Sequence, residues 1–316
     1  MKKILVVLTG GTIGSVSLDG VLDTGDGLAS RPLDFYKQKY GNTVEFEVIS
    51  PLVTLSENMN AEKISVILRA IDKNKNRADI SGIVVTHGSD TLSYSSNIAG
   101  LLFESVKLPI VFVAGNKELS DESGNGLVNF KNAVDFITFA DKSGVYVSWS
   151  NDHDDNTIYY STDFCEADNY FDKFSSYDGK QCGRMNGGKI TVTDDIEIAY
   201  ADAEKVDLSL KNKVLLIKPY PGLDYTAFDL SDFSAVVHYL YHSSTACVEG
   251  ECNSILDFID RCEQNGVRFF IAPLKKHGEK IYSSLEKILQ NSYVEPLYDC
   301  SIEKAYAYAL LEVNKE

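Results

Sequence analysis

The stretch ILVVLTGGTIGS, at residues 4–15, sets the architecture expected for the first half of the chain. Its first five residues are apolar and rich in β-branched side chains, and the run stops at Thr9-Gly10-Gly11. A short apolar run closed by glycines is typical of a central strand in a parallel sheet. We therefore expect Ile4–Leu8 to be a buried strand that is followed by a sharp turn.

Strand-like and helix-like patterns alternate after this first strand. Short apolar runs indicate strands, and apolar residues spaced three and four apart indicate helices. This alternation predicts an α/β fold with a doubly wound, mostly parallel sheet. The expected strands are 44–50, 82–86, 109–114 and 144–149, and the expected helices are 61–74, 93–102 and 126–139.

The same alternation restarts near residue 212 and predicts a second, smaller α/β domain. We expect an N-terminal domain at 1–190, a connection at 191–211 and a C-terminal domain at 212–316. A chain of 316 residues is long enough for two hydrophobic cores of ordinary size. The polar, acidic and aromatic segment Asn151–Asp178 is expected to be an irregular excursion from the first domain.

Bulk composition narrows the classes of partner and cofactor. The formal net charge of -16 gives a surface that repels phosphate backbones and anionic membranes, so neither nucleic acid nor membrane is an expected partner. The apolar run near the first residue is too short for a signal peptide, which favours a cytoplasmic protein. The cysteines form no CxxC pair and the histidines no HExxH motif, so neither a metal nor another cofactor is expected.

The turn at residues 9–15 contains the first candidate functional atoms. Glycines that follow a strand let the backbone turn sharply and approach a ligand closely. The spacing is neither GxGxxG nor that of a P-loop, so a phosphate site is the least supported interpretation. Two others stay open: a purely structural turn, or a turn that presents the Thr12 hydroxyl as a nucleophile or ligand contact.

A second turn of the same kind follows the expected strand 82–86. Its residues, HGSDT at 87–91, join that strand to a helix. Taken alone, Ser89 and Asp90 are best explained as N-cap residues that bond free backbone N–H groups, and His87 as a structural residue. In an open parallel sheet, ligands bind beyond the carboxyl ends of the strands, so both turns are expected at one edge.

Taken together, the two turns resemble the two signature motifs of the L-asparaginase/glutaminase family. That family has TGGTI after its first strand and HGTDT after a later one, and this sequence has TGGTIG at 9–14 and HGSDT at 87–91. The resemblance spans most of the chain, is strongest in its N-terminal half, and is closest to the cytoplasmic branch. Three further segments resemble the family's substrate-binding loop, NLxNA helix and DMTxEA stretch: LSENM at 55–59, NFKNA at 129–133 and DCSIE at 299–303.

The resemblance implies an amidohydrolase that converts L-asparagine or a related small amide to the acid and ammonia. Thr12 matches the family nucleophile, whose hydroxyl attacks the amide carbon to form an acyl-enzyme. Ser89 matches the second catalytic threonine. Asp90 matches the aspartate that contacts the substrate amino group and belongs to the catalytic triad. Backbone N–H groups near Gly11 and Ser89 are expected to stabilise the oxyanion.

The remaining substrate contacts implied by the resemblance lie in the LSENM loop and the two turns. Ser56 and Glu57 match the residues that hold the substrate's α-carboxylate and α-amino groups. Gly11 and Gly88 are placed with them as substrate-binding residues. The implied partner is therefore a small amino-acid amide, and the implied assembly is a homodimer or homotetramer.

Two positions depart from the family pattern. The triad lysine is missing: no lysine occurs from 150 to 172, and alignment on the YFDKF segment places Cys165 there. The mobile-loop tyrosine is also missing: Val21 stands in its place, and substitution by Tyr36 or by a residue elsewhere stays open. A replacement base from Lys117 or from the acidic segment 151–156 stays open. The alternative to the enzyme is a catalytically impaired relative that binds an amino acid or amide without efficient turnover.

Overall fold

The chain divides into two compact units, Met1–Ala203 and Glu204–Glu316. The predicted domain bounds, 1–190 and 212–316 with a connection at 191–211, stay predictions. The computed structural model describes side chains and backbone over most of both units, and the backbone alone at 16–18 and 21–23. The described residues are 1–11, 13, 16–18, 21–23, 31–103, 105–152, 155–194, 206–274 and 280–316.

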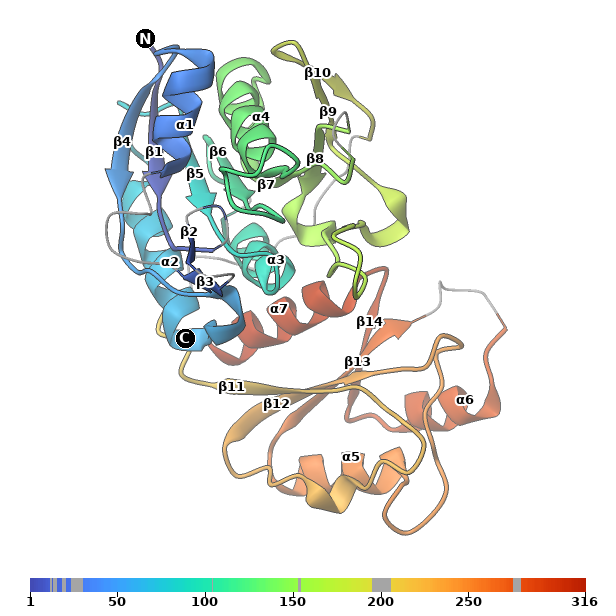
Figure 1. Cartoon of the computed structure of the whole chain (residues 1–316). Helices are drawn as coiled ribbons and strands as arrows, with labels where there is room; N and C mark the ends of the chain where they lie inside the picture. The colour runs from blue at the N-terminus through green and yellow to red at the C-terminus, as the bar shows by residue number, and fades with distance from the viewer. Residues whose placement is uncertain are drawn as a thin grey trace. The chain divides into compact units, whose positions relative to one another are not determined.

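Unit 1 is built on a sheet whose central part is parallel (Figure 1). Over the described residues its strands are, in spatial order, β10 (Lys189–Val192), β9 (Gly183–Asn186), β8 (Thr157–Tyr160), β7 (Gly144–Trp149), β6 (Pro109–Val113), β5 (Gly82–Thr86), β1 (Lys3–Val7) and β4 (Glu45–Ile49). Along the chain, β4 is added on one side of β1, and β5, β6 and β7 on the other. The strand order therefore reverses between β1 and β5, and such a reversal opens a crevice at the carboxyl ends of the two strands.

Helices cover both faces of this sheet, namely α1 (Arg31–Tyr40), α2 (Ala61–Asn74), α3 (Leu92–Phe103) and α4 (Gly126–Phe139) (Figure 1). Helices α1 and α4 share one face, where the rings of Tyr36 and Phe130 lie 5.9 Å apart between centroids. On the other face α2 and α3 lie together, and the Lys75 ammonium is 5.2 Å from the centroid of the Phe103 ring. Strands β2 (Val16–Leu18) and β3 (Val21–Asp23) form a short antiparallel hairpin.

Helix α2 begins and ends at the residues that the sequence predicts. The Asn60 side chain accepts a hydrogen bond from Lys63 N at 3.0 Å, which caps the first turn. Ile64, Ile67 and Ile71 lie on one face and are buried, as an amphipathic period requires. The predicted bounds of β5, α4 and β7 are confirmed in the same way.

The segment Asn151–Asp178 is irregular over 164–176, as expected, but its first part is more regular than its composition suggests. It contains β8, which pairs antiparallel with β7, and the short 3-10 helices η3 (Ser161–Asp163) and η4 (Tyr177–Gly179). All of β8 is buried. A four-residue strand is too short to show a period, so its polar and aromatic neighbours hide it in the sequence.

Unit 2 contains a parallel sheet in sequence order, with a core that includes Phe258 and Phe269. Its described elements are β11 (Lys213–Ile217), β12 (Phe233–Tyr239), α5 (Ile255–Gln264), β13 (Arg268–Leu274), α6 (Ser283–Gln290), β14 (Val294–Tyr298) and α7 (Ile302–Val313). The sequence does not predict β14, because Pro296 lacks a backbone N–H and argues against a strand. The strand lies at the edge of the sheet, where a missing donor is tolerated.

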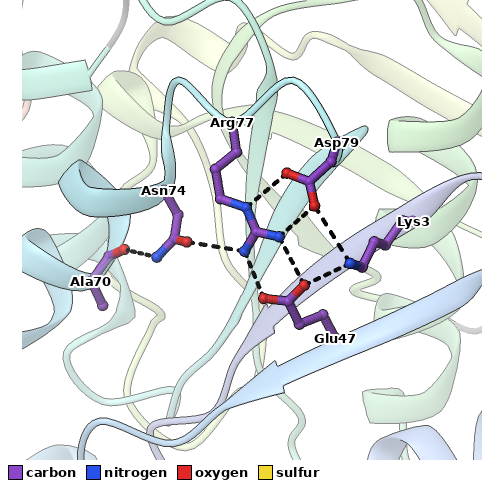
Figure 2. Close-up of polar contacts among 6 residues, drawn as sticks. All are labelled: Lys3, Glu47, Ala70, Asn74, Arg77 and Asp79. Carbon is purple, nitrogen blue, oxygen red and sulfur yellow. Dashed lines mark hydrogen bonds and ion pairs between the residues drawn. The ribbon is translucent and has the colours of Figure 1, made fainter.

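A charged network joins the edge strand β4 to the connection between α2 and β5 (Figure 2). Arg77 donates to Glu47 Oε1 and to Asp79 Oδ2, each at 2.6 Å. Lys3 Nζ lies 2.9 Å from Glu47 Oε2 and 3.4 Å from Asp79 Oδ2. Hydrogen bonds from Arg77 and then Lys3 lower the pKa of Glu47 to about 2. The network therefore stabilises the sheet only while its carboxylates are ionised.

Candidate functional site

The two glycine turns lie against each other beyond the carboxyl ends of β1 and β5. Gly11 has a φ of +81°, in the left-handed region that favours glycine. A Cβ atom on Gly11 would lie 2.4 Å from the His87 carbonyl oxygen and 2.5 Å from the Gly88 nitrogen. Both are backbone atoms that cannot move aside, so only glycine lets the first turn contact the second.

A pair of threonines joins the strand ends from which the two turns leave. Thr9 Oγ1 donates to the Thr86 carbonyl oxygen at 2.5 Å, and Thr9 N donates to Thr86 Oγ1 at 3.2 Å. Both residues are buried. The two hydroxyls therefore satisfy backbone groups at the end of the sheet and fix the separation of the turns.

The loop around the 3-10 helix η2 (Ser56–Asn58) forms a third wall and is bonded to the first turn. Thr54 N donates to the Thr9 carbonyl oxygen at 3.0 Å, and Gly11 N donates to the Thr54 carbonyl oxygen at 3.3 Å. These two bonds continue the parallel ladder past the end of β1. The loop thus follows the path of the first turn.

Ser56 bonds the same loop to the second turn. Its hydroxyl donates to Asp90 Oδ2 at 2.8 Å, and its carbonyl oxygen accepts from Thr91 Oγ1 at 3.0 Å. A Cβ atom on Gly88 would lie 2.5 Å from Ser56 Oγ, so the serine side chain fills the space that this glycine leaves. The three segments therefore pack as one assembly with the Asp90 carboxylate at their junction.

The structure brings most of the residues expected at the site into this assembly. Ser89 is half-buried between Gly88 and Asp90, and the Asp90 and Glu57 side chains are exposed to solvent. Thr12 lies outside the described residues. The contacts link four of them in a chain: Gly11 packs against Gly88, Gly88 packs against Ser56, and Ser56 donates a hydrogen bond to Asp90. The catalytic and substrate-binding roles of all seven residues stay predictions.

His87 has a structural position beneath the second turn. The ring is fully buried, and its Nδ1 lies 2.8 Å from the Gly88 carbonyl oxygen. Because a carbonyl oxygen can only accept, Nδ1 carries the proton. Burial lowers the pKa of the ring, which keeps it neutral near pH 7. His87 therefore fixes the turn rather than serving as a solvent-accessible base.

Two lysines, Lys117 and Lys173, are candidates to replace the missing family lysine, and both contact residues other than Ser89. Lys117 Nζ donates to Ser123 Oγ at 2.6 Å, in the connection between β6 and α4. Lys173 Nζ lies 3.6 Å from Asp152 Oδ1. Cys165 is half-buried, and its thiol donates to the Asp163 carbonyl oxygen at 3.6 Å. None of these contacts supplies an ammonium to Ser89, and the side chain of Val21 lies outside the described residues.

Sequence reasoning missed three residues that hold the assembly together: Thr54, Thr91 and Lys63. The Lys63 ammonium donates to Thr54 Oγ1 at 2.9 Å and to the Asn58 carbonyl oxygen at 2.8 Å. Thr91 lies in the HGSDT motif but has no role assigned there, and Thr54 and Lys63 lie in an ordinary loop and helix start that no pattern marks. Only the tertiary contact between loop and turns shows their place.

The described ranges contain neither a metal cluster nor a membrane-spanning helix. No group of three or more His, Cys, Asp or Glu side chains is placed in them to hold a metal ion. The two described carboxylates of the acidic segment after β7 face cations instead, because Asp152 lies near Lys173 and Asp155 Oδ1 lies 3.2 Å from Arg184. None of the helices in these ranges is both long and apolar enough to cross a bilayer.

Comparison with known proteins places this assembly in a sequence family. The family model "Asparaginase, N-terminal" matches residues 3–197. A glutamyl-tRNA(Gln) amidotransferase subunit from Thermoplasma volcanium is 33% identical over 141 residues, which cover 43% of this chain and 32% of that relative. A protein of the same name from Methanosphaera stadtmanae is 24% identical over 93% of this chain and 68% of its own length. The match to the Thermoplasma relative thus covers about a third of that protein.

Solved structures show the same fold along nearly the whole chain. The thermostable L-asparaginase from Thermococcus kodakarensis superposes with a TM-score of 0.79 at 19% identity, covering 99% of this chain and 93% of that one. L-asparaginase I from Vibrio cholerae superposes with a TM-score of 0.74 at 18% identity, with the same coverage of both chains. At such low identities the structural similarity shows the fold alone. The family is shown by the family model, which matches more than half of the chain. The chain belongs to the asparaginase family.

Proposed function

We propose that this chain hydrolyses the carboxamide of a small amino-acid amide, with L-asparagine as the first candidate, to the acid and ammonia. Membership of the asparaginase family supports amide hydrolysis as the reaction class. The observation that carries the proposal is the hydrogen bond of 2.8 Å from Ser56 Oγ to Asp90 Oδ2, at the contact between the two glycine turns. It joins the exposed carboxylate of Asp90 to the buried hydroxyl of Ser56, which belongs to a separate motif.

In the proposed reaction the Thr12 hydroxyl adds to the amide carbon and its proton passes to the leaving nitrogen. The C–N bond then breaks, ammonia departs, and an ester joins the acyl group to Thr12. Water cleaves that ester, which releases the carboxylic acid and restores the hydroxyl. Ser89 is proposed to assist proton transfer, and backbone N–H groups of the two turns to stabilise the oxyanion.

Recognition of the amino-acid part is assigned to the exposed carboxylates and to Ser56. Asp90 and Glu57 both face solvent beside the turns, so each is accessible to a ligand ammonium. A carboxylate that also accepts a hydrogen bond from a hydroxyl is held in one orientation, which suits a charge-assisted contact. An α-amino group is the feature that we expect this part of the site to select.

A specific observation favours a second candidate, an amino-acid binder that turns over poorly. Lys117 and Lys173 are bonded to Ser123 and to Asp152, so neither takes the place of the missing family lysine beside Ser89. Loss of one member of a catalytic triad typically reduces kcat by about 10⁴-fold. Binding without efficient turnover would follow if no other base replaces that lysine.

Ammonia release separates the two candidates. Wild type and Thr12→Ala would be incubated with L-asparagine, L-glutamine and D-asparagine, and ammonia would be measured over time. The enzyme proposal predicts release from at least one substrate by wild type and a loss of about 10³-fold or more in Thr12→Ala. Release by wild type no faster than by Thr12→Ala would end the enzyme proposal for these substrates. Calorimetry with L-aspartate then tests the binder, which a titration without heat would contradict.

For assembly and location we propose a cytoplasmic homodimer or homotetramer, as the resemblance to the family's cytoplasmic branch implies. The amidotransferase relatives are named as subunits, which suggests a larger complex as the competing arrangement. A net charge of -16 disfavours a role on tRNA, because the chain would repel its phosphates. Light scattering on the purified protein would support the proposal by a mass two or four times that of the chain, and a monomer would contradict it.

A further inference from the structure

Lys63 occupies a helix position that ordinarily disfavours a cation. Asn60 is the N-cap of α2, and its side chain accepts from Lys63 N, so Lys63 is the third residue of the helix. A glutamate or glutamine is favoured there, because it closes the cap and complements the positive end of the helix dipole. The chain departs from this local rule, and such departures concentrate at functional sites.

The Lys63 side chain turns back from α2 to the loop that contains η2. Its ammonium donates to Thr54 Oγ1 at 2.9 Å and to the Asn58 carbonyl oxygen at 2.8 Å. Thr54 precedes η2 and Asn58 ends it, so one cation bridges both ends of the loop. The side chain is partly buried in this position, which limits the screening of its hydrogen bonds by water.

The bridged loop has few bonds of its own. Within η2, Asn58 N donates to the Leu55 carbonyl oxygen and Met59 N to that of Ser56. The carbonyls at the end of so short a helix have no partner in the helix, and a lysine is well suited to cap them. Lys63 supplies that cap at Asn58, directly after the two residues assigned to substrate recognition.

The same ammonium also acts on the first glycine turn through Thr54. The Thr54 carbonyl oxygen accepts from Gly11 N, and the Thr54 hydroxyl receives the Lys63 hydrogen bond. A shift of this threonine would change the contact of Gly11 as well as the path of the loop. Lys63 is therefore connected to loop 54–58 directly and to the first glycine turn through Thr54, without lying in either turn.

We propose that Lys63 is a positioning residue, which holds loop 54–58 against the two turns and thereby sets the affinity of the site for its amino-acid ligand. The affinity part rests on the proposed function. Lys63 does not touch the reacting atoms in this proposal. Its loss is expected to raise Kd and KM, because the loop carries the groups assigned to recognition.

The test uses full-length variants with two independent readouts. Lys63→Met removes the charge at similar length, Lys63→Arg keeps a cation with several donors, and Thr54→Val removes the hydroxyl acceptor with little change of shape. Lys73→Met is the matched control, because Lys73 is an exposed lysine on the last turn of the same helix. Hydrogen exchange of the amides at 54–59 measures the loop, and calorimetry with L-aspartate measures affinity.

The proposal expects faster exchange at 54–59 in Lys63→Met and Thr54→Val, and a Kd for L-aspartate raised by about tenfold, as for loss of one charge-assisted hydrogen bond. Lys63→Arg should recover most of both, and Lys73→Met should match wild type. Unchanged exchange and Kd in Lys63→Met would overturn the inference. So would Lys63→Arg with no better affinity than Lys63→Met. No binding by wild type would instead overturn the proposed function on which the affinity part rests.

Discussion

The contact between Gly88 and Ser56 allows a sharp test of how the site is packed. In Gly88→Ala the new methyl carbon would lie 2.5 Å from Ser56 Oγ and 2.6 Å from Ser56 Cβ. These separations are far below van der Waals contact, so the serine must move and its hydrogen bond to Asp90 must break or stretch. Ser56→Gly removes both clashing atoms at once. The next neighbour of the methyl would then be Gly11 Cα at 3.4 Å, which is an ordinary contact.

The expected free energies follow from these distances. Overpacking of this kind typically costs about 1–3 kcal/mol, which we assign to Gly88→Ala. Ser56→Gly should cost about 1–2 kcal/mol, through the lost hydrogen bond and the greater backbone freedom of glycine. In the double variant the overpacking cost disappears, so the two changes should be less costly together than their sum by about 1–3 kcal/mol.

Urea unfolding at 25 °C measures these costs, with the fluorescence of Trp149 as the probe. This is the one tryptophan of the chain, it lies in unit 1, and it is fully buried, so its signal reports the unit that contains the site. The control pairs Gly88→Ala with Ser120→Gly, an exposed turn residue between β6 and α4, where simple additivity is expected. Additivity within about 0.5 kcal/mol for Gly88→Ala with Ser56→Gly would refute the packing described here.

Three further predictions concern the scaffold. Because hydrogen bonds from Arg77 and Lys3 lower the pKa of Glu47 from 4.5 to about 2, their stabilisation is present above pH 4.5 and lost as the pH falls through about 2. The difference in unfolding midpoint between wild type and Glu47→Gln should shrink over that range, and a constant difference would contradict the network. Asn129→Ala leaves two buried backbone groups at the ends of β6 and β7 unpaired, which should cost about 2–4 kcal/mol in urea unfolding; a loss below about 1 kcal/mol would argue against this role. Burial lowers the pKa of His238 to about 4, so an NMR titration of its ring should have its midpoint there, and a midpoint at 6.5 would contradict the burial.

Much of the fold could be predicted because its strands are short, apolar and closed by glycines or polar residues. β5 and α4 have the predicted bounds for this reason. Helix α1 was missed because Leu33 is the one aliphatic residue in RPLDFYKQKY, although a proline in the first turn and lysines in the last are helix signals. β14 and β8 were missed because a proline in one and the shortness of the other obscure the strand pattern.

The site could be predicted only as far as topology determines it. Adjacent parallel strands place their carboxyl ends together, so two motifs that follow β1 and β5 are expected to meet. The contacts of the turns with Thr54 and Lys63 depend on how the loop after β4 returns to them, which no local pattern encodes. The same applies to the lysine missing from the family triad, because only side-chain positions show that Lys117 and Lys173 are bonded elsewhere.

A crystal structure of the wild-type protein with L-aspartate, the product of the proposed reaction on L-asparagine, tests the central claim most directly. The account predicts the ligand at the junction of the two turns, with its α-amino group at Asp90 or Glu57 and its side-chain carboxylate within hydrogen-bond reach of the hydroxyls of Thr12 and Ser89. An aspartate bound elsewhere, or hydroxyls of Thr12 and Ser89 that face separate regions around it, would contradict the account.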